Sequence, residues 1–157
     1  MVQGLTNLEL QSGEGERILL CLPAGIHLEA IKERLLKGGC KVFLASSPHD
    51  ALKRLQIDSP RAVIIEESWV AYFENLSMDS RRELICVLIG KGLTTGDYIA
   101  AYIRSVDLVV DTEDISSLYR LLNETIESHE RLYRTFKNML REVKRIERRI
   151  YASFQEV

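Results

Sequence analysis

The stretch RAVIIEES, residues 61–68, decides the fold of this chain. Four apolar residues, three of them β-branched, follow one another without interruption and end at two acids. This pattern predicts a strand buried on both faces, which is typical of a parallel sheet covered by helices. Pro60 precedes the stretch and sets the start of the strand. Because ligand crevices in such sheets lie at the carboxyl ends of the strands, Glu66 and Glu67 become candidate functional residues.

Four further apolar runs have the same character, at residues 17–22, 40–45, 85–89 and 106–110. Between them lie segments with helical spacing of apolar residues, at 26–37, 48–59, 77–84 and 98–104, and a last helix follows residue 115. Residues 69–75 are expected to form a loop or an irregular turn. The alternation of strands and helices predicts an α/β fold, a doubly wound five-stranded parallel sheet with a long C-terminal helix.

Two helix starts carry recognisable signals. Ser47 is a suitable N-cap, and Pro48 suits the first turn that follows it. Thr94 and Asp97 have the spacing of a capping box, with Asp in place of the usual Glu or Gln. We therefore expect one helix to begin just after Ser47 and another at Tyr98, with Thr94 and Asp97 as its capping box.

Composition places the chain among ordinary globular domains. The 157 residues are 46% hydrophobic and 28% charged, and no apolar run approaches the ~20 residues that a membrane span needs. Residues 1–16 are expected to form a flexible lead-in rather than a signal peptide, so a cytoplasmic location is expected. The three cysteines have no CxxC spacing, which favours buried thiols over a disulfide framework or a zinc site.

Charge is unevenly distributed along the chain. Residues 131–149 contain eight Lys or Arg and two Glu, a net charge of +6; the total is −2, so the remainder carries −8. We expect an α/β domain over residues 17–128 and a protruding amphipathic helix over residues 129–157.

The C-terminal helix has apolar residues at alternating steps of four and three, the spacing of a heptad seam. A helix from Ser116 to Val157 would be ~60 Å long, whereas a domain of this size is ~30 Å across. The apolar residues therefore predict a homodimer or a helical partner protein, in parallel or antiparallel orientation. The predicted interface residues are Leu132, Tyr133, Phe136, Met139, Leu140, Val143, Ile146 and Ile150.

Residues 17–128 resemble a response-regulator receiver (CheY-like) domain of bacterial two-component signalling. The resemblance lies in five alternating strands and helices with similar spacings and in a third strand that ends at an acid, Glu66. It implies a flavodoxin-like or receiver-like sheet with the strand order 2-1-3-4-5. It also implies protein partners and a role in signalling.

The residues that receivers use for phosphorylation are replaced. The family holds Mg²⁺ with two acids after the first strand, phosphorylates an aspartate after the third, and uses a Thr or Ser and a Lys after the fourth and fifth. The corresponding positions of this chain are Leu22, Pro23, Glu66, Gly90 and Asp111. The resemblance therefore implies a degenerate pseudo-receiver that is not an enzyme and has no metal or other cofactor.

Two other functions remain open. The loop that contains Gly90, Lys91, Gly92, Thr94 and Thr95 could bind a phosphate through its backbone amides, although it lacks the order of a nucleotide-binding loop. The basic C-terminal helix could bind nucleic acid. This function is not favoured, because the aromatic residues of the helix fall on its apolar seam rather than on the basic face.

Two groups of residues at the ends of the predicted strands each have two possible interpretations. Glu66, Glu67 and Asp111 could converge on a divalent metal or form an acid/base pair, but solvated acids, paired with Lys91, are the more ordinary expectation. Three aromatic residues follow the third strand, and they either cover the end of the core or form an exposed contact patch. These residues are Trp69, Tyr72 and Phe73.

Overall fold

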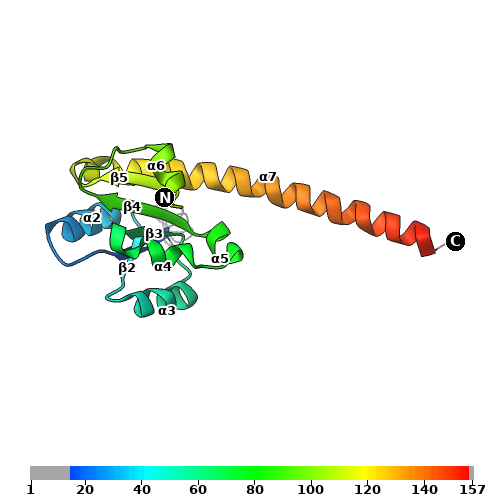
Figure 1. Cartoon of the computed structure of the whole chain (residues 1–157), viewed down its shortest axis with the longest axis horizontal. Coiled ribbons are helices and arrows are strands. Elements are labelled where there is room, and N and C mark those ends of the chain that lie inside the picture. Colours follow the sequence, from blue (N-terminus) through cyan, green and yellow to red (C-terminus); the bar gives the residue numbers. More distant parts are fainter. Residues whose placement is uncertain (1–14, 156–157) are drawn as a thin grey trace, which may run out of the picture. The chain divides into compact units, whose positions relative to one another are not determined.

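A computed structural model describes residues 15–155 of the chain, in which strands and helices alternate (Figure 1). Of the predicted lead-in, residues 1–14 lie outside the described residues. In chain order the elements are β1 (Arg17–Cys21), α2 (Ile26–Lys37), β2 (Lys41–Leu44), α3 (Pro48–Asp58), β3 (Ala62–Ile65), η1 (Glu67–Trp69), α4 (Val70–Glu74), α5 (Met78–Glu83), β4 (Ile85–Gly90), α6 (Tyr98–Ile103), β5 (Leu108–Asp111), η2 (Thr112–Asp114) and α7 (Ile115–Gln155).

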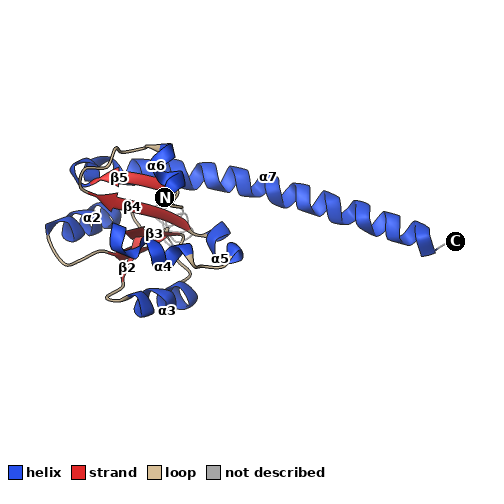
Figure 2. Cartoon of the chain, in the orientation of Figure 1, coloured by secondary structure: helices blue, strands red, loops and turns tan. Residues whose placement is uncertain are grey.

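The strands form one five-stranded parallel sheet in the order β2-β1-β3-β4-β5 (Figure 2). Leu20 pairs with Ile64, and Ile64 pairs with Val87, so the central strands are in continuous register. All four residues of β3 are buried, as expected for a strand covered on both faces. The predicted fold class and strand order are confirmed.

Helices cover both faces of the sheet. Alternate strand residues such as Val63 and Leu88 share a buried cluster with Ala51 of α3, Phe73 of α4 and Ala101 of α6. The intervening strand residues face the opposite way, because side chains alternate along a strand.

On that second face, α2 contacts the first turns of α7. The Tyr119 hydroxyl donates a hydrogen bond to the Gly38 carbonyl oxygen at 2.9 Å, and Arg34 donates to the Ser116 carbonyl oxygen at 3.3 Å. The sheet is therefore doubly wound.

Both helices begin at the predicted residues, but only one of the two predicted caps is correct. Ser47 caps α3, since its hydroxyl accepts a hydrogen bond from the Asp50 amide at 3.1 Å. At α6, however, Asp97 is itself the N-cap and accepts from the amides of Ile99 and Ala100. Asp is one methylene shorter than Glu, so its carboxylate serves the amides just after it instead of reaching back to close a capping box with Thr94.

The predicted loop at 69–75 is also wrong, because η1 and α4 occupy most of it. Val70 and Phe73, three residues apart, lie on one side of this short helix and are both buried. Their contact with the core outweighs the weak helical signal of a five-residue segment. Two strand ends shift as well: β4 includes Gly90, and β5 begins at Leu108 rather than at residue 106.

The chain separates into two compact units, residues up to Thr125 and residues from Ile126 onward. Helix α7 begins in the first unit and supplies the described part of the second, through Gln155. Over the described residues, no helix has both the length and the apolar character needed to cross a membrane.

Candidate functional site

The carboxyl edge of the sheet brings together the residues that correspond to a receiver's phosphorylation site. Gly90 and Asp111 are directly paired in the β4–β5 register. Cys21 at the end of β1 pairs with Ile65 at the end of β3, and Leu22 and Glu66 follow directly after them. Parallel strands thus place these positions, with Pro23, along one edge.

Each acid at this edge has a partner close to it in the fold. The Ser68 hydroxyl donates to Oε1 of Glu66 at 2.8 Å. Glu67 is paired with Arg104 at the end of α6, and not with Lys91 as the sequence suggested. Asp111 caps η2, where its Oδ1 accepts from the amide of residue 113 at 3.2 Å.

The donor set at this edge does not fit a hard divalent cation. Such ions take oxygen ligands, and neither Leu22 nor Pro23 carries a side-chain oxygen. Each of the three acids is engaged with a different partner. Within residues 15–155, no group of three or more His, Cys, Asp or Glu side chains is placed to hold a metal ion.

The loop from Gly90 to Gly96 is tied to the next strand by specific hydrogen bonds. The Thr95 hydroxyl donates to the Asp114 carboxylate at 2.6 Å and accepts from the Asp111 amide at 2.9 Å. The Gly96 amide donates to the carbonyl oxygen of residue 109 at 2.9 Å. One of the two threonine hydroxyls in the predicted phosphate loop is therefore engaged with the protein itself.

The rest of this loop has mixed exposure. Leu93 lies over Gly90 so closely that a Cβ at that glycine would be 3.0 Å from the leucine methyl. Lys91 and Thr94 are exposed. Gly92 has a φ of 81°, in the left-handed region that favours glycine. The loop thus combines an apolar anchor with an exposed lysine at its tip.

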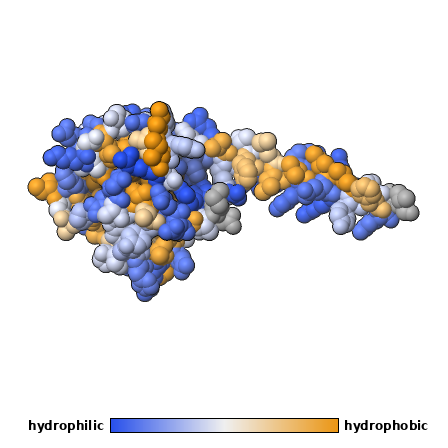
Figure 3. All heavy atoms as spheres, in the orientation of Figure 1, coloured by the Kyte–Doolittle hydropathy of each residue, from blue (hydrophilic) through white to orange (hydrophobic). Residues whose placement is uncertain are grey.

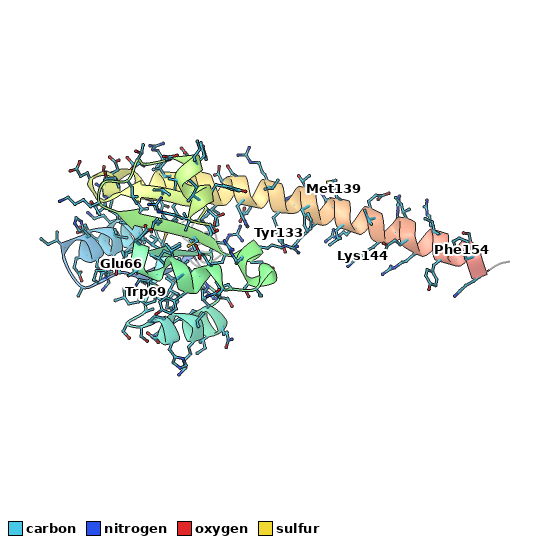
Figure 4. The ribbon with its side chains drawn as sticks, viewed as in Figure 1. Glu66, Trp69, Tyr133, Met139, Lys144 and Phe154 are labelled. Atoms are coloured by element: carbon cyan, nitrogen blue, oxygen red, sulfur yellow. The ribbon has the colours of Figure 1, made fainter. Side chains whose placement is uncertain are left out.

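Two of the three aromatic residues after β3 cover the end of the core. Phe73 is buried and Trp69 is half-buried against the same cluster. Tyr72 is half exposed and meets Trp69 edge-on, with ring centroids 6.4 Å apart. Figure 4 labels Trp69 beside Glu66 on this part of the domain.

The three cysteines are free and buried, as predicted. Burial raises the pKa of the Cys21 thiol and of the Cys86 thiol, each to about 12. It also raises the pKa of Cys40. A thiolate is the reactive form of cysteine, so these side chains behave as small apolar core residues.

Two surface features of the sheet domain went unnoticed in the sequence. Helix α6 exposes Tyr98 and Tyr102, at 87% and 86%, together with two isoleucines. The signal was available in the sequence, because α6 consists only of Tyr, Ile and Ala, and a surface helix of that composition must expose some apolar side chains. The second feature is a hollow of about 400 Å³ between α5, α6 and the beginnings of β4 and β5, with Arg81, Cys86 and Asp107 in its lining.

The second unit carries an apolar stripe along one side of its helix (Figure 3). We define the apolar stripe as Leu132, Tyr133, Phe136, Met139, Leu140, Val143, Ile146 and Ile150. Seven of these residues are exposed and Tyr133 is intermediate. Among the seven exposed residues the exposed fraction ranges from 42% for Phe136 and Leu140 to 73% for Leu132, so within the single chain most of the stripe is open to solvent.

The opposite side of the same helix is basic. Figure 4 shows Met139 of the stripe and Lys144 on opposite sides of the helix. Lys137 places its Nζ 4.5 Å from the centre of the Tyr133 ring, and Arg145 donates to Glu142 at 2.8 Å. We define the basic face as Arg134, Lys137, Arg141, Lys144, Arg145 and Arg148.

The solved structures to which the chain is similar include receiver domains of response regulators. The chain is similar to the receiver domain of Francisella response regulator 1452, with a TM-score of 0.60 and 13% identity over 73% of this chain and 98% of that one. It is similar to NtrX from Brucella abortus, solved in complex with ATP, with a TM-score of 0.62 and 16% identity over 78% of this chain and 29% of that one. It is also similar to the CheY-like protein TadZ from Pseudomonas aeruginosa, with a TM-score of 0.51 and 20% identity over 69% of this chain and 99% of that one.

At these identities the likeness establishes the fold and not the activity. The expected resemblance to receiver domains is confirmed at the level of the fold. No protein-family model matches the sequence, and no curated protein is similar to it in sequence.

Proposed function

We propose that this chain is a pseudo-receiver, a non-catalytic interaction module that associates with a second copy of itself through the apolar stripe. It would serve as a signalling adaptor or an assembly subunit in the bacterial cytoplasm. The observation that carries the proposal is the apolar stripe, eight residues in regular spacing on a helix that leaves seven of them exposed.

The chemistry of the sheet edge supports a non-catalytic role. Phosphoryl transfer depends on positive charge that stabilises the transferring group. Leu22 and Pro23 offer no side-chain oxygen for Mg²⁺, and Asp111 places a negative charge where a receiver has a lysine. Glu66 is the only acid aligned with the acceptor position, and it accepts a hydrogen bond from Ser68.

Apolar area supports self-association. Fully burying a side chain of this kind contributes roughly 1.5–3 kcal/mol. Association costs ~4–15 kcal/mol in lost translational and rotational freedom, so even partial burial of eight residues is sufficient to offset it. The stripe includes aromatic residues and a methionine, which are enriched where proteins contact one another.

Light scattering on the full chain tests the proposal. We expect a mass of at least twice 18.0 kDa at micromolar concentrations. A truncation after Ser128 removes the stripe and keeps the buried Leu118 and Leu122 of α7, so we expect a folded monomer. A monomeric full chain would contradict self-association and would direct attention to a different protein as the partner.

A further inference from the structure

We propose that two copies of α7 pair antiparallel, in the register that places Glu142 of one helix beside Arg149 of its partner. This inference rests on the self-association proposed above and adds its orientation, which the sequence left open. The pairing would be symmetric about a point between residues 144 and 145. Each seam residue n would then lie opposite residue 289 − n of the second copy, while border residues, which lie to either side of the seam, meet two positions away from that level (142 with 149, and 133 with 154).

The heptad positions of the stripe define what lies at its borders. Phe136, Val143 and Ile150 occupy one seam position, and Leu132, Met139 and Ile146 occupy the other. Border positions on either side of such a seam contact the partner helix and set its orientation. On one border the residues are Thr135, Glu142 and Arg149; on the other they are Tyr133, Leu140, Glu147 and Phe154.

Parallel pairing brings like charges together. In a parallel pair, the first border of one helix meets the second border of its partner, five residues further along. Glu142 would therefore meet Glu147 of the second copy, and the symmetry repeats this contact on the other side. Like charges at such positions destabilise a helix pair.

Antiparallel pairing in the proposed register brings opposite charges together. Each border of one helix then contacts the same border of the second copy. By symmetry the Glu142–Arg149 contact forms twice, once with the glutamate from each helix. On the other border Tyr133 meets Phe154 twice, and aromatic pairs of this kind are favourable. The alternative antiparallel register, shifted by one heptad, places Glu142 beside Glu142 and leaves Phe154 without its aromatic counterpart.

The seam accepts this register. Met139 lies opposite Ile150, and Val143 lies opposite Ile146, so the central layers are apolar. Phe136 lies opposite Ser153, whose hydroxyl already donates to the Ile150 carbonyl oxygen of its own helix at 2.7 Å. The serine therefore brings no unsatisfied donor into the contact. The basic face remains on the outer side of both helices, which keeps its charges in water.

A charge reversal separates the orientations by the sign of its effect. Glu142→Arg places two arginines side by side in the proposed pairing, so the dimer Kd should rise by roughly tenfold. In a parallel pair the same change would replace repulsion with attraction, and the dimer would tighten. Adding Arg149→Glu should restore the original Kd. Arg145→Ala is the matched control, because it removes the hydrogen bond within the helix and leaves the Glu142–Arg149 contact.

Spin labels measure the register directly. With single cysteines introduced at 138, 145 or 152 in the full chain, the proposed pairing separates equivalent labels along the axis by ~20, ~1.5 and ~23 Å. The native thiols are buried, and unsubstituted protein gives the background labelling.

Each outcome of the labelling has one meaning. Equal short distances at all three sites would establish parallel pairing and overturn the inference. Separations of ~9, ~12 and ~33 Å would establish the shifted register and also overturn it. A monomeric mass with no dipolar signal would instead refute the proposed function on which the inference rests.

Discussion

The Thr95 hydroxyl donates to the Asp114 carboxylate at 2.6 Å and accepts from the Asp111 amide at 2.9 Å. This side chain therefore links the loop after β4 to the end of β5. Thr95→Val keeps the branched shape and removes both hydrogen bonds. The change should lower the free energy of unfolding by about 1–2 kcal/mol, since the Asp111 amide is partly buried and loses its acceptor. Urea unfolding measures the difference.

The adjacent threonine is a matched control. Thr94 is exposed, and no hydrogen bond of its side chain is found among the described residues. Thr94→Val should therefore change the stability by no more than about 0.5 kcal/mol. Equal effects of the two substitutions would show that the Thr95 hydroxyl does not hold this loop.

The sheet edge should not accept a phosphoryl group. Leu22 and Pro23 carry no side-chain ligand for a metal ion, and Asp111 places a negative charge where a receiver has a lysine. After incubation with acetyl phosphate and Mg²⁺, intact mass spectrometry should show the unmodified chain, while a phosphorylatable receiver in the same buffer gains one phosphoryl group. A stoichiometric adduct that disappears in Glu66→Gln would establish catalysis and contradict the proposed function.

The Gly90–Gly96 loop should not bind common nucleotides tightly. One of its threonine hydroxyls is engaged with Asp114, and Leu93 lies over Gly90. A ligand present at about 100 times its Kd would stabilise the fold by ~2.7 kcal/mol, which a thermal-shift screen detects readily. A shift of that size that is lost in Lys91→Ala, and kept in Thr94→Val, would identify the loop as a ligand site.

Much of the fold was predictable because its signals are strong and local. The uninterrupted apolar run before Glu66 identified a strand buried on both faces. Ser47 followed by Pro48 identified a helix start, because both residues favour that position on their own. The α4 segment was missed because Val70 and Phe73 form a helix through contact with a distant core, which a short window of sequence does not contain. The same limit explains Glu67, whose partner Arg104 lies 37 residues away.

The buried thiols should make stability fall at alkaline pH. The pKa of Cys86 is raised from 9.0 to about 12 by burial, so the unfolded chain releases this proton at a lower pH than the folded chain does. Between those two values the unfolded state binds fewer protons. The free energy of unfolding therefore decreases as pH rises, by up to ~1.4 kcal/mol per pH unit for each such thiol.

Comparison of the native chain with Cys86→Ala isolates this effect. Urea unfolding is measured at about pH 8 and about pH 10, on either side of the pH at which the thiol of the unfolded chain begins to titrate. Tyrosines and lysines also titrate at high pH, but they contribute equally to both proteins. The variant should lose less stability between the two conditions. If both proteins lose the same amount, the Cys86 thiol does not titrate differently in the folded chain.

The apolar stripe should fail as an interface when charge is placed within it. Phe136→Asp with Val143→Asp puts two carboxylates on one seam position, where each would have to be desolvated in any pairing of the helices. The full-length variant should be a monomer by light scattering, with the thermal unfolding of the sheet domain preserved. Asn138→Asp with Ala152→Asp is the control, because it adds the same charge to exposed positions outside the stripe and should leave the dimer intact. A dimer that survives the first pair of changes would place the interface elsewhere, with the exposed Tyr98 and Tyr102 of α6 as the next surface to test.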